Sequence, residues 1–523
     1  MRTEIDLALV NTRMITMDTP LRGLAWITIN EGRITGIGSG KLPAKLARNV
    51  KNYINCEGKT LVPGFHDAHC HVLSSSTSLL AVDCSPSNVS SISGIKDLLI
   101  EKRSKSSNNN WIRGFGYNEF YLDEKRHPNR WDLDEAVPDR PVKLLHRSGH
   151  AIVLNSTALN LVNINRNTPD PVYGVIDRHH GTGDPTGLLL EMDRYLDSVI
   201  PLHPRDELEE ALRLFNQRCL SFGITSLQDA TANNSVEQWR LFSDLSRQGR
   251  ITPSLTLMPG IESLPSFLNE GLSFGYQSGN LRVGAAKLII NQTTGDMQPP
   301  PKQLLELIKY ANHVGFQVAI HAVESESVRA AITAIQQAET EEISNDRRHR
   351  IEHCSECPTD LINEISKSGI SVVTQPGFIY YHGQRYLAET EITRIPWLYR
   401  IGSLQESKTT IAASSDSPVI EPNPLMGIYA AVSRKTNSGD TVLPSEAISA
   451  HSALRMYTLG SATVNFQEHE KGSITVGKIA DLALLDEDPI LSKPENIPDI
   501  KVMMTIVRGK VAWRHESFIP FAD

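Results

Sequence analysis

Residues 60–72 read Thr60-Leu61-Val62-Pro63-Gly64-Phe65-His66-Asp67-Ala68-His69-Cys70-His71-Val72, an apolar run followed by two histidines one residue apart. The apolar run is typical of a buried strand that ends near the histidines. Because side chains alternate between the faces of a strand, His69 and His71 are expected to point the same way. Two neutral imidazoles on one face can bind a divalent cation such as zinc. His-x-His pairs also occur by chance on solvated strands, so a metal site requires further ligands elsewhere.

Seven more β-rich runs follow along the chain, separated by stretches in which apolar residues recur at helical spacing. The runs lie at residues 223–229, 254–258, 283–288, 317–321, 350–353, 371–375 and 410–416. The clearest helices are predicted at residues 204–221, 236–248, 302–314 and 325–338. Eight strands with intervening helices are typical of a parallel α/β fold. They predict a (β/α)₈ TIM-like barrel with its chemistry at the carboxyl ends of the strands.

Both ends of the chain have the texture of short alternating strands. These strands are predicted at residues 6–10, 26–29, 33–37, 479–485 and 502–507. Chain termini often lie close together, so we expect one small β-sandwich domain built from residues 1–62 and 465–523. Two separate small β-subdomains are the alternative. The barrel domain would then occupy residues 63–464.

The segment from residue 84 to residue 205 is too long for a simple connection. It contains Trp111-Ile112-Arg113-Gly114-Phe115-Gly116-Tyr117-Asn118 and Pro141-Val142-Lys143-Leu144-Leu145-His146-Arg147-Ser148-Gly149-His150. Long insertions in such folds usually serve function. We therefore expect a capping insertion after the first strand that covers the mouth of the barrel.

The composition restricts the classes of partner. A formal net charge of -8 argues against a nucleic-acid binder, which would show a basic face. Six cysteines are too sparse for a disulfide scaffold in a chain of 523 residues. The first residues lack the apolar core of a signal peptide, and no run approaches the length of a membrane span. These features favour a cytoplasmic enzyme with a small-molecule substrate and no membrane partner.

Five of the eight predicted strands carry residues that can bind metal. Strands one, five, six and eight end in the His69–His71 pair, His321, His353 and Asp416, and strand four carries Lys287. Each residue has a structural alternative: a core histidine, a helix cap for Asp416, or a snorkelling lysine. A lysine inside an apolar strand is costly unless it is paired, neutralised or modified. Carbamylation would convert it into an anion that can bridge two cations.

The ordered motifs resemble the amidohydrolase superfamily, within amidohydrolase family 3, which includes N-substituted formamide deformylases and YtcJ-like proteins. The resemblance covers nearly the whole chain. The matching segments are residues 63–71, Lys287, Ala319-Ile320-His321-Ala322, Ile351-Glu352-His353-Cys354, Ser415-Asp416-Ser417-Pro418, the capping residues 147–150, 155–159 and 185–189, and residues 471–482.

The resemblance implies a site for one or two divalent ions, with zinc expected. His69, His71 and Asp416 would hold one ion, His321 and His353 the other, and N6-carboxylated Lys287 would bridge them. Asp416 would act as the catalytic general base and then as the general acid. The chain departs from the family pattern at residues 291–294 and at Val323-Glu324-Ser325, close to the expected substrate. The resemblance therefore implies the metal ligands but not the identity of the substrate.

Other residues carry weaker predictions. His150, Tyr117 and Asn118 from the cap and Tyr381 after strand seven are candidate substrate-binding residues. Buried structural roles, or an exposed aromatic loop at Tyr381, are the alternatives. Cys354 and Cys357 have the spacing of half a zinc knuckle, but no second pair exists in the sequence.

The leading hypothesis is a metal-dependent amidohydrolase that cleaves a C–N bond in an amide, formamide or other small N-acyl compound. Deamination, carbamate hydrolysis or lactone hydrolysis on the same metal site is the second hypothesis. A non-catalytic relative that has lost its metals is the third. Relatives of the family are commonly dimers, so a homodimer is expected.

Overall fold

The strands of the α/β series form two five-stranded sheets, which are parallel except that β15 pairs antiparallel with β16. The computed structural model describes residues 4–105, 111–171, 174–201, 203–292, 295–339 and 346–519. One sheet has the order β15-β16-β14-β13-β6 and the other β17-β18-β19-β20-β21. Their bounds are β6 (Phe65–Cys70), β13 (Ile224–Asp229), β14 (Ser254–Leu257), β15 (Gln277–Ser278), β16 (Leu281–Val283), β17 (Ala286–Ile289), β18 (Val318–Ala322), β19 (Arg350–His353), β20 (Ser371–Thr374) and β21 (Ile411–Ala413). The predicted α/β class is confirmed.

The fourth predicted strand is interrupted. Residues 283–288 were expected to form one strand, but β16 ends at Val283 and β17 begins at Ala286. The break includes Gly284, where a Cβ would lie 2.6 Å from the Thr256 side chain and where the N–H donates to the Leu257 carbonyl at 2.7 Å. The Lys287 N–H then donates to the Pro259 carbonyl at 2.8 Å. Backbone bonds thus join the two sheets here, although the strands do not form one continuous barrel ladder.

Helices follow most of these strands, as predicted. The four helices that the sequence indicates most clearly are present: α7 (Arg205–Ser221), α8 (Val236–Arg247), α10 (Pro301–His313) and α11 (Ser325–Glu339). Further helices are α9 (Leu264–Asn269), α12 (Thr359–Lys367), α13 (Gly377–Glu389), α14 (Ile401–Glu406), α15 (Pro424–Ser433), α16 (Ala450–Arg455) and α17 (Ser461–Thr463). None of the helices in the described residues is long and apolar enough to cross a membrane.

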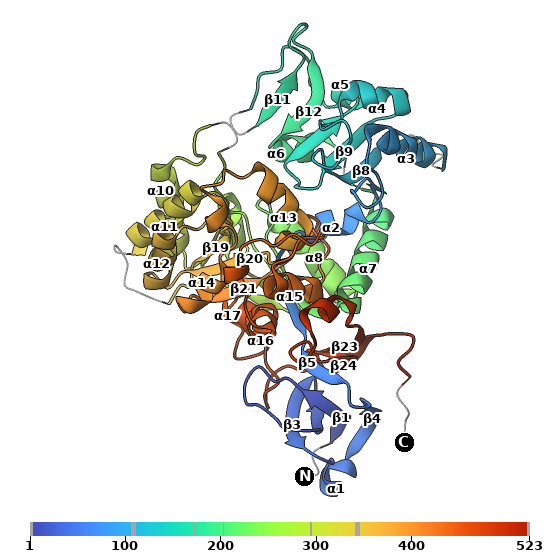
Figure 1. Cartoon of the computed structure of the whole chain (residues 1–523), viewed down its shortest axis with the longest axis vertical. Helices are drawn as coiled ribbons and strands as arrows, with labels where there is room; N and C mark the ends of the chain where they lie inside the picture. Colours follow the sequence, from blue (N-terminus) through green and yellow to red (C-terminus); the bar gives the residue numbers. More distant parts are fainter. Residues whose placement is uncertain are drawn as a thin grey trace. The chain divides into compact units, whose positions relative to one another are not determined.

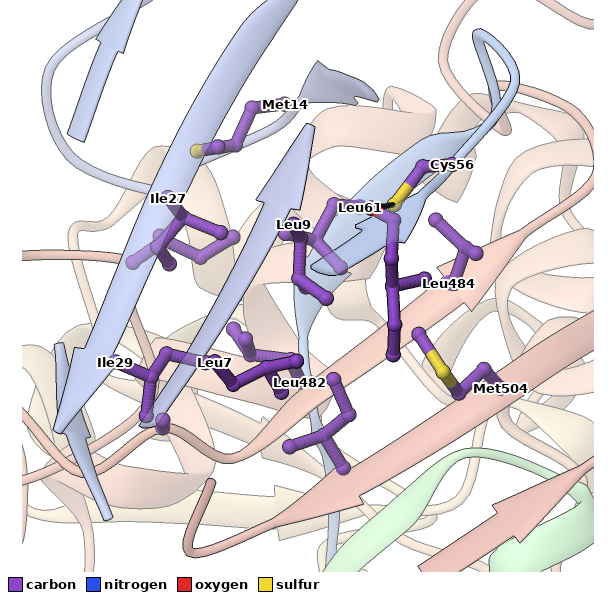
Figure 2. Close-up of a cluster of buried hydrophobic side chains, with 14 of the residues drawn as sticks. Leu7, Leu9, Met14, Ile27, Ile29, Cys56, Leu61, Leu482, Leu484 and Met504 are labelled. Carbon is purple, nitrogen blue, oxygen red and sulfur yellow. Dashed lines mark hydrogen bonds between the residues drawn. The ribbon is translucent and has the colours of Figure 1, made fainter. Parts of the chain in front are cut away.

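Strands from the two ends of the chain share one eight-stranded sheet. Its order is β24-β23-β22-β5-β1-β2-β3, with β4 beside β1. Figure 1 labels β1, β3, β4 and β5 from the N-terminal part of the chain and β23 and β24 from the C-terminal part. The bounds are β1 (Ile5–Met14), β2 (Ala25–Asn30), β3 (Arg33–Ser39), β4 (Val50–Asn55), β5 (Thr60–Pro63), β22 (Leu482–Leu485), β23 (Val502–Val507) and β24 (Lys510–Arg514). The ends meet where β5 pairs antiparallel with β22. Figure 2 shows side chains from both ends, such as Leu61 and Leu484, in one buried cluster.

A buried ion pair links this terminal sheet to the parallel strands. Lys471 and Asp481 are 2% and 5% exposed, and Lys471 Nζ lies 3.4 Å from Asp481 Oδ2. Lys471 Nζ also donates to Ser226 Oγ on β13 at 3.2 Å and to Ser254 Oγ on β14 at 2.9 Å. One ammonium group therefore contacts two parallel strands and the segment that leads into β22.

The inserted segment has a sheet of its own. By its internal contacts the chain divides into two compact units: Met1–His71, Asn216–Ile290 and Pro301–Asp523 form one, and Val72–Phe215 with Asn291–Pro300 the other. The second unit contains β7 (Val82–Asp83), β8 (Ile112–Tyr117), β9 (Val142–His146), β10 (Ala151–Leu154), β11 (Val175–Arg178) and β12 (Pro185–Leu190), in the order β11-β12-β10-β9-β8-β7. Most of the insertion predicted at residues 84–205 lies in this unit.

Candidate metal centre

His69 is held at the end of β6 with one ring nitrogen left for a ligand. The side chain is 1% exposed. Its Nδ1 contacts Glu352 Oε2, and because an ionised carboxylate only accepts hydrogen bonds, this contact favours the tautomer with the proton on Nδ1. The lone pair is then on Nε2, which lies 3.4 Å from Asp416 Oδ1. Burial, followed by the charge of Lys287, lowers the pKa of His69 to about 3, so the imidazole is neutral at pH 7.

His353 is oriented in the same manner by an amide. It ends β19, and its backbone has a φ of 73°, so the direction of the side chain does not follow strand alternation. His353 Nδ1 lies 2.9 Å from Gln375 Oε1. The amide is fixed because Gln375 Nε2 donates to Ser414 Oγ at 3.0 Å. His353 Nε2 is buried without a hydrogen-bond partner among the described residues, as expected of a nitrogen that can bind a metal ion.

Asp416 brings a carboxylate to the two imidazoles. It follows β21, and its N–H donates to the His69 carbonyl at 2.9 Å. His71 Nε2 lies 3.0 Å from Asp416 Oδ1, while His71 Nδ1 lies 3.0 Å from Thr231 Oγ1. Burial alone would raise the pKa of Asp416, but the hydrogen bond to His71 and the nearby His69 and His353 outweigh it and hold the pKa below its usual range. Asp416 is therefore ionised at neutral pH.

His321 and Lys287 complete the predicted set. The rings of His321 and His353 lie 4.4 Å apart between centroids, and those of His69 and His353 lie 4.9 Å apart. Lys287 on β17 is only 2% exposed, so it does not snorkel to the surface. Its Nζ has no hydrogen-bond partner among the described residues, and burial lowers its pKa to about 8.

The donor set suits a divalent metal. One ligand atom each from His69, His353 and Asp416 lies within 4.8 Å of the others, and all three residues are buried. Two imidazoles and a carboxylate are ligands that zinc takes in proteins. Both imidazoles also carry the outer hydrogen bond, to Glu352 and to Gln375, that fixes the tautomer of metal-binding histidines. The residues present thus fit a metal site at the carboxyl ends of these strands.

The sequence pattern of the Amidohydrolase family matches residues 52–512, which include β5, β22 and β23 of the terminal sheet, the insertion and the centre described above. The chain belongs to the Amidohydrolase family. The resemblance seen in the sequence motifs is therefore confirmed.

Two relatives match nearly the whole length of this chain. The N-substituted formamide deformylase of Arthrobacter pascens is 27% identical over 532 residues, 96% of this chain and 97% of that protein. YtcJ of Bacillus subtilis is 27% identical over 511 residues, 93% of this chain and 95% of that protein. A crystal structure described as an uncharacterized metal-dependent hydrolase from Pyrococcus furiosus is 26% identical, with a TM-score of 0.72, and covers 92% of this chain and 99% of that chain.

The candidate substrate residues lie in different settings. Tyr117 is fully buried, and its hydroxyl lies 2.9 Å from His127 Nδ1. Asn118 is also buried and accepts the Phe120 N–H at 3.1 Å. His150 is exposed and lies 3.1 Å from Glu191 Oε2. Tyr381 on α13 packs partly buried against the cluster around Phe378 and Tyr399. Their contact with substrate stays a prediction.

Four residues at the centre were not singled out from the sequence. Glu352, Gln375 and Thr231 contact the imidazoles of His69, His353 and His71, and Arg350 pairs with Glu352. A signal was available for one pair, because charged residues at positions 350 and 352 of a buried strand must find partners. The contacts of Glu352 with His69 and of Thr231 with His71 join residues too far apart in the chain for a local sequence pattern to reveal them.

Proposed function

We propose that this member of the Amidohydrolase family is a metal-dependent hydrolase that cleaves the C–N bond of a small N-acyl compound, an amide or a formamide. The observation that supports it is the convergence of ligand atoms from His69, His353 and Asp416 in one buried cluster. The similarity to an N-substituted formamide deformylase supports a formamide rather than another amide as the substrate. The proposed reaction is hydrolysis of the C–N bond, and the substituent on the nitrogen is not specified.

The metal ligands follow from the residues around the cluster. His69, His71 and Asp416 would hold one divalent ion, preferably zinc, and His321 and His353 a second, with N6-carboxylated Lys287 between them. For His71 to bind the ion through Nε2, its proton would have to lie on Nδ1, from which it can be donated in a hydrogen bond to Thr231 Oγ1. A bound divalent metal supplies Lewis acidity and lowers the pKa of water at the site.

The residues of the chain then handle the proton. Asp416 is ionised and buried, so its carboxylate can accept a proton from the attacking water and later donate it to the departing amine. Deamination and the hydrolysis of carbamates or lactones would use the same groups. These reactions can therefore be distinguished only by testing the protein on different substrates.

A substrate panel with metal analysis tests the proposal. The purified chain should contain zinc or another divalent metal and should hydrolyse at least one N-substituted formamide or simple amide. Asp416→Asn should lower kcat, whereas Glu446→Gln, a buried carboxylate paired with Arg400, should leave catalysis unchanged. Protein without stoichiometric metal, or turnover confined to nucleobases, carbamates or lactones, would contradict the assignment.

The finer architecture is part of the same proposal. We infer that the two parallel sheets close into a (β/α)₈ barrel, since the Asp416 N–H bonds to the His69 carbonyl on one side and the Lys287 N–H to the Pro259 carbonyl on the other. The terminal sheet would fold as a β-sandwich, and the insertion would cap the site. The homodimer and the cytoplasmic location stay predictions.

A further inference from the structure

Glu352 occupies a position between a buried arginine and a proposed metal ligand. Its side chain and that of Arg350 are 0% and 1% exposed. Arg350 Nε contacts Glu352 Oε1, and Arg350 Nη2 lies 3.2 Å from Glu352 Oε2. Glu352 Oε2 also contacts His69 Nδ1. One carboxylate thus links the guanidinium group to the imidazole.

The same arginine also holds the backbone beside His69. Arg350 Nη2 donates to the Ala68 carbonyl at 2.7 Å, and Arg350 Nη1 donates to Gln228 Oε1 at 2.7 Å. The peptide that leads into His69 and the ring of His69 are therefore both fixed from Arg350. A carboxylate that served only to neutralise Arg350 would not need to meet the imidazole as well.

We infer that Glu352 is a positioning residue that accepts the Nδ1 proton of His69 in a hydrogen bond and so keeps His69 Nε2 as the metal-binding nitrogen. The inference rests on the proposed function, because it assumes that His69 binds metal. Outer carboxylates of this kind fix the ring orientation of a histidine ligand and increase its basicity. Their loss typically costs about 10- to 100-fold in metal affinity.

The test separates the hydrogen bond from the charge. Removing Glu352 alone would leave Arg350 buried and unpaired, which destabilises a fold for reasons unrelated to metal. Two double variants avoid this problem: R350M/E352Q keeps an amide oxygen that can accept from His69 Nδ1, and R350M/E352L does not. Their zinc affinities are measured by competition with a chromophoric chelator, and the free energy of unfolding is measured on the metal-free proteins.

The expected result is that R350M/E352L binds zinc at least about 10-fold more weakly than R350M/E352Q. Equal affinities of the two variants would overturn the inference. The matched control is R400M/E446L, which removes another largely buried Arg–Glu pair, with Arg400 Nε 3.0 Å from Glu446 Oε1. It should leave zinc affinity unchanged, and a loss equal to that of R350M/E352L would also overturn the inference.

A measurement on the wild-type chain keeps the inference testable if a variant does not fold. Long-range ¹H–¹⁵N correlation spectra of the metal-free protein should show His69 protonated at Nδ1, and protonation at Nε2 would overturn the proposal. The proposed function fails separately: zinc binding without hydrolysis of any N-acyl substrate would leave the role of Glu352 intact. Absence of zinc binding in the wild type would overturn both.

Discussion

Replacing Lys471 by methionine should destabilise the fold by about 3 kcal/mol. Breaking a buried ion pair from one side costs about 3 to 5 kcal/mol because the remaining charge stays buried. The lower end applies here, since Asp481 Oδ1 would still accept the Arg508 N–H at 2.8 Å. Lys471→Met also removes the donor that Ser226 and Ser254 share. The double variant K471M/D481N removes both charges and should recover more than half of the loss.

Urea unfolding followed by circular dichroism, in the presence of a chelator so that metal binding does not contribute, measures both values. Lys51→Met is the control, because Lys51 makes only exposed ion pairs, with Glu4 and Asp6, and its loss should change stability little. A cost for Lys471→Met no larger than that of the control would refute the view that this ion pair joins the two parts of the fold. So would a double variant that is less stable than the single one.

Three further predictions concern the centre. Asp416→Asn should lower kcat by at least about 100-fold while the protein stays folded, and a smaller effect would exclude Asp416 as the proton acceptor. Treatment with a chelator should abolish hydrolysis and lower the thermal midpoint, and added zinc should restore both; activity that survives chelation would contradict the metal role. Gly260→Ala should cost about 1 to 3 kcal/mol, because its Cβ would lie 2.1 Å from the Ala232 carbonyl oxygen and would displace the backbone bridge to Lys287. Gly249→Ala, with open space around its Cβ but a positive φ, should cost less.

The order of strands and helices in the α/β part was accessible from sequence because buried strands and amphipathic helices leave strong local patterns. The interruption at Gly284 was not, because the Thr256 side chain that leaves no room for a Cβ there belongs to a neighbouring strand. The pairing of β5 with β22 could be expected only as a tendency of chain ends to meet, and its register was not predictable from local pattern.

The centre shows the same division. His69, His353 and Asp416 could be named because each ends a strand, and ends of parallel strands gather at one edge. Their outer partners could not be named in this way, because Glu352 and His69 are 283 positions apart. The direction of the His353 side chain could not be predicted either, since its left-handed backbone departs from the alternation of an extended strand.

The pairing of β5 with β22 also has a consequence for biosynthesis. On the ribosome β5 emerges early, while β22, its hydrogen-bonding neighbour, is made more than four hundred residues later. Until then Leu61 lacks the Leu484 and Met504 side chains of its final cluster, so the nascent chain exposes an apolar strand edge. Such an edge invites aggregation during translation, and we expect the yield of this protein to depend on chaperones that bind unfinished polypeptides.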